Sequence, residues 1–344
     1  MLNSKSWCAF FVLASACAPS VRLQVLQPAD IMVPSSVEVI AVVDRSKAKN
    51  FGQGVLGVLE GAISGESIGA DTEGRIGAVE GVRDLLMESP RFEVVEPGAV
   101  ELDSSLFDTV MPWKEGKQIC KSASCNAIVA LEALDSDGVT TVEVHKSTET
   151  VDGKERVITS FEAIRETTVL TAWRLYDVDN KQVIDDLRNH TYSVSSSFMA
   201  DTEDDAIYGL PDDNQTVRDA AFIAGEMYGR RIAPSYIMVT RTFFGKGDDR
   251  MKEARDMALA DQWAKASKIW TRVFESTDDA KLKGQAAYNL ALAAEVKGDL
   301  GAAMAWQDKA ARNWPKGKIL RYGTTLDYRA HDAQRLDDQM AVEE

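Results

Sequence analysis

A glycine-rich segment with interleaved carboxylates is the part of the sequence best suited to a specific site. Its glycines recur every four residues, and acidic residues stand among them: Gly57, Glu60, Gly61, Gly65, Glu66, Gly69 and Asp71. In a helix, the glycine stripe would allow close contact with another helix or with a second subunit. In a loop, the three carboxylates could hold a cation, and simple packing against the first strand is a third interpretation. Each glycine costs a helix about 1 kcal/mol relative to alanine, so this many glycines indicate a reason for their presence.

The same region contains a glycine spacing that is typical of dinucleotide-binding folds. Gly52, Gly54 and Gly57 form G-x-G-x-x-G. A dinucleotide site needs these glycines at the end of a strand, and it needs an acidic residue at the end of the next strand. Here residues 45–51 separate the glycines from the strand, and the acidic residue is missing. We therefore expect no nucleotide ligand.

The cysteines and histidines do not form a catalytic or metal-binding pattern. Cys120 and Cys125 are five residues apart, which is too far for a disulfide within an unbroken helix. Residues 122–124 (Ser-Ala-Ser) could break the helix and permit a disulfide; two buried thiols are the alternative. The three histidines, His145, His190 and His331, are isolated in the sequence. Since no nucleophile motif accompanies them, we expect no catalytic residues, no metal and no cofactor.

The amino terminus has the character of an export signal. Lys5 precedes an apolar run from Trp7 to Leu13, and small residues follow. Ala14-Ser15-Ala16 is an acceptable cleavage site for the general signal peptidase, whereas Leu13 to Cys17 resembles a bacterial lipobox, in which the cysteine is acylated. Acylation of Cys17 would anchor the protein in a membrane. The residue after the cysteine is not aspartate, so we expect the outer membrane, on its periplasmic face.

The charge balance argues against nucleic acid as a partner. The 344-residue chain has a formal net charge of −15. A basic surface patch for nucleic acid or anionic lipid is therefore not expected. The length is sufficient for two domains, each with its own core.

The body of the chain alternates between strands and helices before it becomes rich in strands. A β-branched run at 37–44 predicts a strand buried on both faces. An amphipathic helix (73–88), a strand (92–96), a helix (113–121) and an apolar strand follow. The segments after residue 138 predict an antiparallel meander, a helix at 217–231 and a last strand. The fold class expected is α+β, a mixed sheet with flanking helices.

This order of elements resembles the N-terminal domain of the TolB translocation protein and the curli-secretion lipoproteins. The similarity rests on "VIAVVDRS", "LLMESPRFEVVEPG", "CNAIVALEAL" and "AWRLYDVDNKQVID". With its "EGAISGESIGAD" segment the chain is closer to a family of Bacteroidetes envelope lipoproteins. That resemblance implies an architecture and a place in the envelope, without a known activity.

Residues 252–315 show small and bulky side chains at helical spacing, which predicts two helical hairpins. Ala266 and Ala303 take equivalent places in the two hairpins. The second copy resembles the tetratricopeptide repeat through Leu290, Ala291, Ala294, Gly298, Asp299, Ala303, Ala310 and Pro315. The residues expected to build the repeat helices are Trp263, Ala266, Trp270, Tyr288, Ala291, Ala303 and Trp306. Such helices either bind a protein partner or pack on their own domain.

These observations predict a non-enzymatic lipoprotein that acts as a protein-binding scaffold or an envelope assembly component. The alternative is an oligomeric component of a secretion channel, related to the curli-secretion lipoproteins, with the glycine segment between subunits. The expected partners are the membrane, through the lipid anchor, and another protein. The expected organisation is a signal peptide (1–16), a lipidated linker (17–36), an α/β domain (37–245), tetratricopeptide-like helices (248–315) and a C-terminal tail (316–344).

Overall fold

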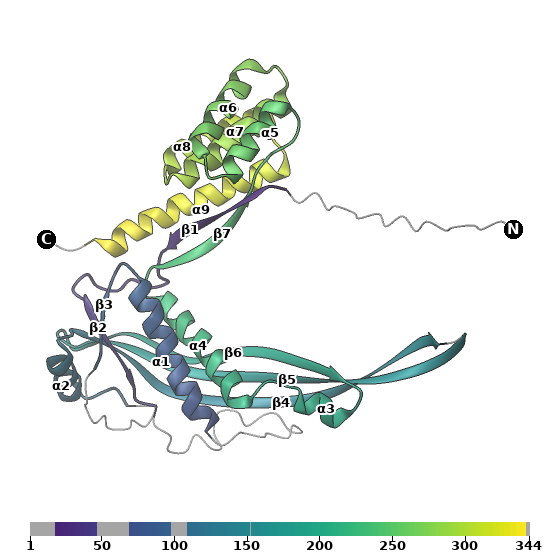
Figure 1. The fold of residues 1–344 in the computed structure, drawn as a ribbon. Helices are drawn as coiled ribbons and strands as arrows, with labels where there is room; N and C mark the ends of the chain where they lie inside the picture. Colours follow the sequence, from purple (N-terminus) through teal and green to yellow (C-terminus); the bar gives the residue numbers. More distant parts are fainter. Residues whose placement is uncertain (1–17, 47–68, 98–108, 152, 342–344) are drawn as a thin grey trace. The chain divides into compact units, whose positions relative to one another are not determined.

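The computed structural model describes residues 18–46, 69–97, 109–151 and 153–341 (Figure 1). Their contacts divide the chain into two compact units. Of the described residues, those between 26 and 236 and those at 335–341 form the sheet unit, and residues 18–25 and 237–334 form the helical unit. Each unit has its own hydrophobic core.

The sheet unit is built on a five-stranded mixed sheet with the order β3-β2-β4-β5-β6. Its strands are β2 (Val39–Asp44), β3 (Glu93–Val95), β4 (Ala127–Val151), β5 (Lys154–Asp177) and β6 (Gln182–Ala200). Strand β2 runs parallel to β3 and to the beginning of β4, and β4, β5 and β6 form an antiparallel meander. The predicted meander is therefore confirmed.

Helices cover both faces of the parallel part of this sheet. Helices α1 (Ala70–Glu88) and α4 (Asp213–Ile232) lie on one face (Figure 1). Ile40 and Trp173 are buried in the core that these helices share with the sheet. Helix α2 (Trp113–Ala123) covers the other face, where Ala41 and Tyr176 are buried. Strand β2 is buried on both faces because successive side chains alternate between these two cores. This arrangement explains its continuous β-branched sequence.

Strands β4, β5 and β6 extend past the covering helices as a long arm (Figure 1). Strand β2 pairs with β4 only as far as Leu131, whereas the β4–β5 register continues to Val151 opposite Lys154. The short helix α3 (Glu203–Tyr208) packs on the arm through Ala206, which contacts the core around Ala163.

The helical unit consists of paired antiparallel helices. They are α5 (Asp249–Leu259), α6 (Trp263–Ser276), α7 (Ala280–Val296), α8 (Leu300–Asn313) and α9 (Gly317–Met340), whose residues from Arg335 on belong to the sheet unit. Aspartates fix three of the helix starts, because the side chains of Asp248, Asp279 and Asp299 accept hydrogen bonds from the first backbone N–H groups. A mixed sheet with flanking helices followed by paired helices confirms the predicted fold class.

Two segments differ from the expected linker and tail. Within residues 17–36 lies strand β1 (Ser20–Gln27), which pairs with β7 (Ser235–Thr242) in a separate two-stranded sheet. Within residues 316–344 lies α9, whose Ile319, Tyr322 and Leu326 are buried in the helical core. The physical reason is the same in both places: an apolar stripe at strand or helix spacing needs a partner to cover it. In the described part of the chain, no helix has the length and apolar character needed to cross a bilayer.

Candidate functional site

A buried ionic cluster lies where β2 ends, at the edge at which open α/β sheets commonly hold ligands. The backbone N–H of Arg45 donates to the carbonyl oxygen of Leu131 at 2.9 Å, which is the end of the β2–β4 ladder. The β4–β5 register then shifts between Leu131 and Ala133, so Glu132 sits in a bulge. Bulges redirect side chains and are frequent beside functional sites. Within the described pairing, this bulge is the only shift in the register between β4 and its two neighbouring strands.

Glu132 is the centre of the cluster. Arg45 Nη1 donates to both of its carboxylate oxygens at 2.9 Å, and the Tyr176 hydroxyl also donates to it. Arg174 Nη1 lies 3.7 Å from Glu132 Oε1, and its Nε lies 3.2 Å from Asp186 Oδ2. Arg45, Glu132, Arg174 and Tyr176 are each at most 2% exposed. The opposite charges offset a desolvation cost that would be severe for any one of them alone.

The electrostatics of this cluster favour a structural role over acid–base chemistry. Burial and the nearby Glu132 carboxylate raise the pKa of Tyr176 to about 12. The phenol therefore remains protonated near neutral pH and donates its hydrogen bond. Guanidinium groups do not exchange protons in this range. Glu132 is already engaged by Arg45 and Tyr176, so it is not placed to act as a free general base.

The glycine-rich segment contributes one described site residue to this edge of the sheet. Asp71, in the first turn of α1, accepts a hydrogen bond from Ser136 Oγ at 2.7 Å. Gly69 precedes α1 in a left-handed conformation, with φ of 99°. Cys17 and the remaining residues of the segment lie outside the described residues: Gly57, Glu60, Gly61, Gly65 and Glu66.

Cys120 and Cys125 form a disulfide. Helix α2 ends at Ala123, and Ser124 adopts a left-handed conformation with φ of 58°. The chain therefore turns between the two cysteines at the serine–alanine–serine segment, and of the two alternatives that the sequence left open the disulfide is the one formed. The disulfide closes the carboxyl end of α2 and carries no ligand role.

The residues predicted for the repeat helices are brought together as the core of the helical unit. Trp306 is partly buried and the others are buried: Trp263, Ala266, Trp270, Tyr288, Ala291 and Ala303. Phe243, which follows β7, stacks edge-on against Trp263 and Trp270 at ring distances of 5.9 and 6.1 Å. Tyr288 lies 4.9 Å from Tyr322 of α9. These residues hold the hairpins together, so a binding surface must use other side chains.

Such a surface exists between α8 and α9. A groove of about 370 Å³ runs between the two helices. Met304, Ala311 and Leu320 line it, and the carboxylates of Asp308 and Asp327 also border it. Leu320 is 50% exposed although it is apolar. The groove was not predicted from the sequence, because residues 316–344, which contain α9, were expected to form a C-terminal tail.

Comparison with known proteins supports the same division of the chain. Residues 252–331 match a family described as Domain of unknown function (DUF6340), a span that includes the first part of α9 together with the hairpins. No curated protein matches the chain. A second family model matches residues 37–244, more than half of the sequence. The chain therefore belongs to the family described as Domain of unknown function (DUF8603).

Proposed function

We propose that this protein is a non-enzymatic scaffold of the bacterial envelope, anchored by an acylated Cys17 to the periplasmic face of the outer membrane. The sequence resemblance to TolB-type and envelope lipoprotein domains supports this location. The buried ion pair between Arg45 and Glu132 supports a structural role for the sheet unit. In this proposal the helical unit binds a partner protein.

The groove between α8 and α9 is the observation that carries the partner-binding role. Helical repeats commonly bind peptides in grooves between their helices, where apolar anchors supply affinity and charges supply orientation. Here Met304 and Leu320 offer apolar contact, and Asp308 and Asp327 supply negative charge. The complementary partner is an amphipathic helix with apolar anchors flanked by lysine or arginine.

Substitution of Leu320 tests this role. Leu320→Lys places a positive charge in the groove and should repel a basic partner, lowering its recovery after crosslinking in cells at least about tenfold. Leu259→Lys is the matched control, because Leu259 is 57% exposed on α5 and does not line the groove. Quantitative mass spectrometry of both variants and wild type measures the effect. Equal recovery with all three proteins would exclude the groove as the binding surface.

Labelling with a fatty acid tests the anchor. Wild-type protein should incorporate labelled palmitate and remain with the membrane fraction, and Cys17→Ser should do neither, because one thiol is the attachment point. Cys8→Ser is the control within the signal segment and should be labelled like wild type. Equal labelling of wild type and Cys17→Ser would refute acylation at this residue.

The open edges of the arm favour oligomeric assembly as a second candidate function. Within the described pairing, β4 beyond Leu131 hydrogen-bonds only to β5, and β6 is the last strand of the sheet. Unpaired strand edges are templates for pairing with another chain. Pairing of one chain's β4 edge with the next chain's β6 edge would be heterologous and could close a ring. Light scattering in mild detergent should then give a mass several times that of one chain, whereas a monomer would eliminate this candidate.

A further inference from the structure

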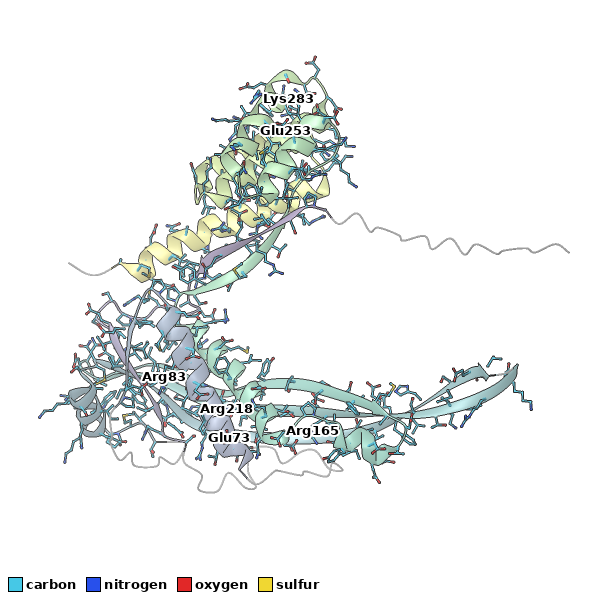
Figure 2. The ribbon with its side chains drawn as sticks, in the orientation of Figure 1. Glu73, Arg83, Arg165, Arg218, Glu253 and Lys283 are labelled. Carbon is cyan, nitrogen blue, oxygen red and sulfur yellow. A yellow bond between two sulfur atoms is a disulfide. The ribbon has the colours of Figure 1, made fainter. Side chains whose placement is uncertain are left out.

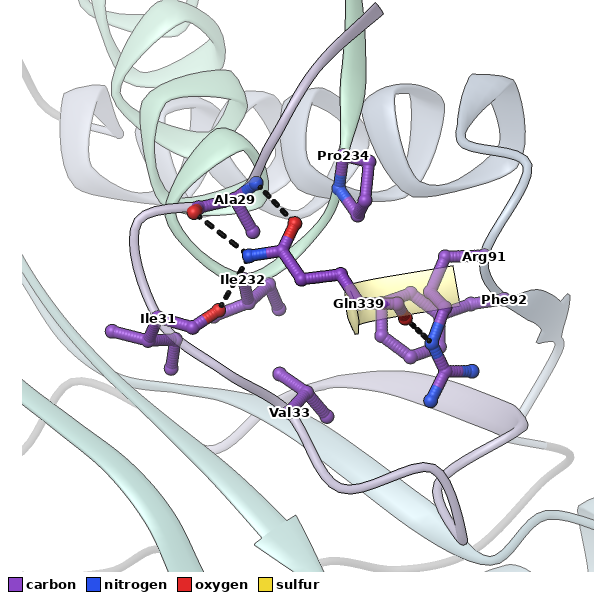
Figure 3. Close-up of a pocket in the computed structure, with 8 residues that line it drawn as sticks. All are labelled: Ala29, Ile31, Val33, Arg91, Phe92, Ile232, Pro234 and Gln339. Atoms are coloured by element: carbon purple, nitrogen blue, oxygen red, sulfur yellow. Dashed lines mark hydrogen bonds between the residues drawn. The ribbon is translucent and has the colours of Figure 1, made fainter. Parts of the chain in front are cut away.

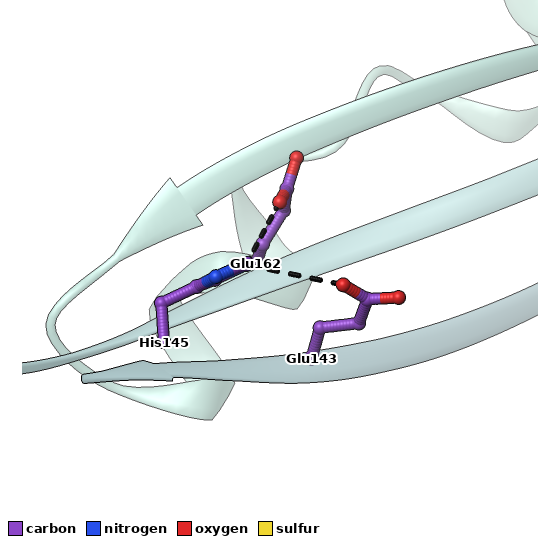
Figure 4. Close-up of side chains that lie close together, drawn as sticks. All are labelled: Glu143, His145 and Glu162. Atoms are coloured by element: carbon purple, nitrogen blue, oxygen red, sulfur yellow. Dashed lines mark hydrogen bonds and ion pairs between the residues drawn. The ribbon is translucent and has the colours of Figure 1, made fainter.

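A histidine and two glutamates meet on one face of the arm (Figure 4). Glu143 and His145 are two residues apart on β4, so their side chains project from the same face. The β4–β5 register places Glu162 directly opposite Glu143. The backbone pairing therefore fixes all three side chains beside one another, although 17 residues separate His145 from Glu162 in the sequence.

The distances within this cluster are short. His145 Nε2 lies 3.0 Å from Glu162 Oε2 and 4.0 Å from Glu143 Oε2. One ligand atom from each of the three residues lies within 4.8 Å of the others. Two like charges directly opposite in a sheet are destabilising unless a cation offsets them. Among the described ion pairs, neither glutamate is matched by a lysine or an arginine.

We propose that Glu143, His145 and Glu162 form a binding site for a divalent transition metal such as Zn²⁺, in preference to Mg²⁺ and Ca²⁺. A mixed set of one imidazole and two carboxylates suits Zn²⁺ better than Mg²⁺ or Ca²⁺, which prefer oxygen ligands alone. Bonds of about 2.0–2.2 Å in a tetrahedral site place the donor atoms about 3.4 Å apart. The two distances from His145 Nε2, 3.0 and 4.0 Å, lie on either side of this value, and water would complete the coordination.

The site can adjust to the metal because its side chains are accessible. The side chains of Glu143 and His145 are 62% and 43% exposed, and that of Glu162 is 25% exposed. Small rotamer changes therefore bring the carboxylates to the ion, while the paired strands hold the backbone in place. Ordinary surface pairing of His145 with Glu162 uses the same contacts without an ion, and the experiment must distinguish the two. The site does not depend on the proposed scaffold function.

Calorimetric titration of Zn²⁺ into the metal-stripped full chain tests the proposal. Wild type should bind one equivalent, and His145→Ala and Glu162→Gln should each weaken binding at least about tenfold. His331→Ala and Glu166→Gln are matched controls, exposed and outside the cluster, that should bind like wild type. Mg²⁺ and Ca²⁺ should bind more weakly than Zn²⁺.

X-ray absorption spectroscopy of the zinc-loaded wild type, at the zinc edge, gives a second test that needs no variant. The fine structure of the spectrum should show that one imidazole nitrogen and several oxygen atoms are bound directly to zinc. A first shell without imidazole would overturn the proposal, as would undiminished binding by His145→Ala. Tighter binding of Ca²⁺ than of Zn²⁺ would also overturn it, because it would indicate a diffuse acidic surface.

Discussion

The side chain of Glu295 in α7 is fully buried and accepts hydrogen bonds from two arginines and one tyrosine. Arg329 Nη1 of α9 donates to it at 2.6 Å, Arg241 Nη2 of β7 at 3.2 Å, and the Tyr322 hydroxyl at 2.6 Å. Burial by itself would raise the pKa of Glu295, but the hydrogen bonds from Tyr322, Arg241 and Arg329 lower it below its ordinary value of 4.5. One carboxylate thus connects three elements of the helical unit.

Glu295→Gln should destabilise the protein by about 3–5 kcal/mol, because it leaves two partly buried arginines without a negative partner. The native pKa is lowered, so the unfolded chain binds more protons in acid. The contribution of Glu295 is therefore full above pH 4.5 and is lost as the pH falls through the native pKa. Urea denaturation as a function of pH should show that the variant lacks this part of the acid dependence. Glu275→Gln, at an exposed site on α6, should change stability by less than about 0.5 kcal/mol. Equal effects of the two substitutions would contradict this account.

Helices α1 and α4 pack so closely that their glycines contact the backbone of the other helix. A Cβ atom on Gly81 would overlap the carbonyl oxygen of Phe222, and a Cβ atom on Gly225 would overlap that of Ala78. The close helix contact suggested for the glycine stripe at 57–69 is therefore seen for glycines of the next segment. The sequence signal for this contact is the spacing of the glycines within α1, which lie three and four residues apart.

Gly81→Ala should destabilise the sheet unit by about 1–3 kcal/mol, because overpacking forces the helices apart and exceeds the gain in helix propensity. Gly116→Ala in α2 is the control, since its nearest neighbouring atoms would lie at least 3.5 Å from the new Cβ. The control should be neutral or more stable by up to about 1 kcal/mol. Chemical denaturation measures both variants. If Gly81→Ala were as stable as wild type, the close contact between the two helices would not be required for stability.

At the scale of the whole chain, segments near its two ends, around Ala29 and Gln339, meet within the sheet unit. Gln339 of α9 enters a small pocket lined by Val33, Phe92 and Ile232 (Figure 3). Its Oε1 accepts a hydrogen bond from the backbone N–H of Ala29 at 2.9 Å, and its Nε2 donates to the carbonyl oxygen of Ala29 at 3.0 Å. Figure 2 draws the side chains of the described residues on the ribbon. The side-chain amide of Gln339 thus pairs with the N–H and the carbonyl oxygen of Ala29, as the backbone of an adjacent strand would.

Gln339→Ala should weaken this attachment by about 1–3 kcal/mol, because the buried N–H of Ala29 loses its acceptor. Hydrogen–deuterium exchange of residues 335–340 should become faster in the variant. Asp338→Ala, at the adjacent exposed position, should leave the exchange nearly unchanged. Slow exchange in both variants would mean that other contacts hold the end of α9.

Periodicity and turn chemistry in the sequence were sufficient for the fold class, the buried strand at 37–44, the meander and the paired helices. These features depend on neighbours within a few residues, so local spacing determines them. Strand β1 was missed because its apolar stripe is short and its partner β7 lies far away in the chain. Helix α9 was missed because its buried stripe consists of Ile319, Tyr322 and Leu326, few residues for a helix of its length. Only tertiary structure decided which side chains meet across strands and helices. The Glu132 bulge and the Glu143–His145–Glu162 cluster arise from the pairing of β4 with β5, and the groove beside Leu320 arises from the packing of α9 on α8. Local spacing in the sequence specifies neither the bulge in that register nor the groove left by that packing.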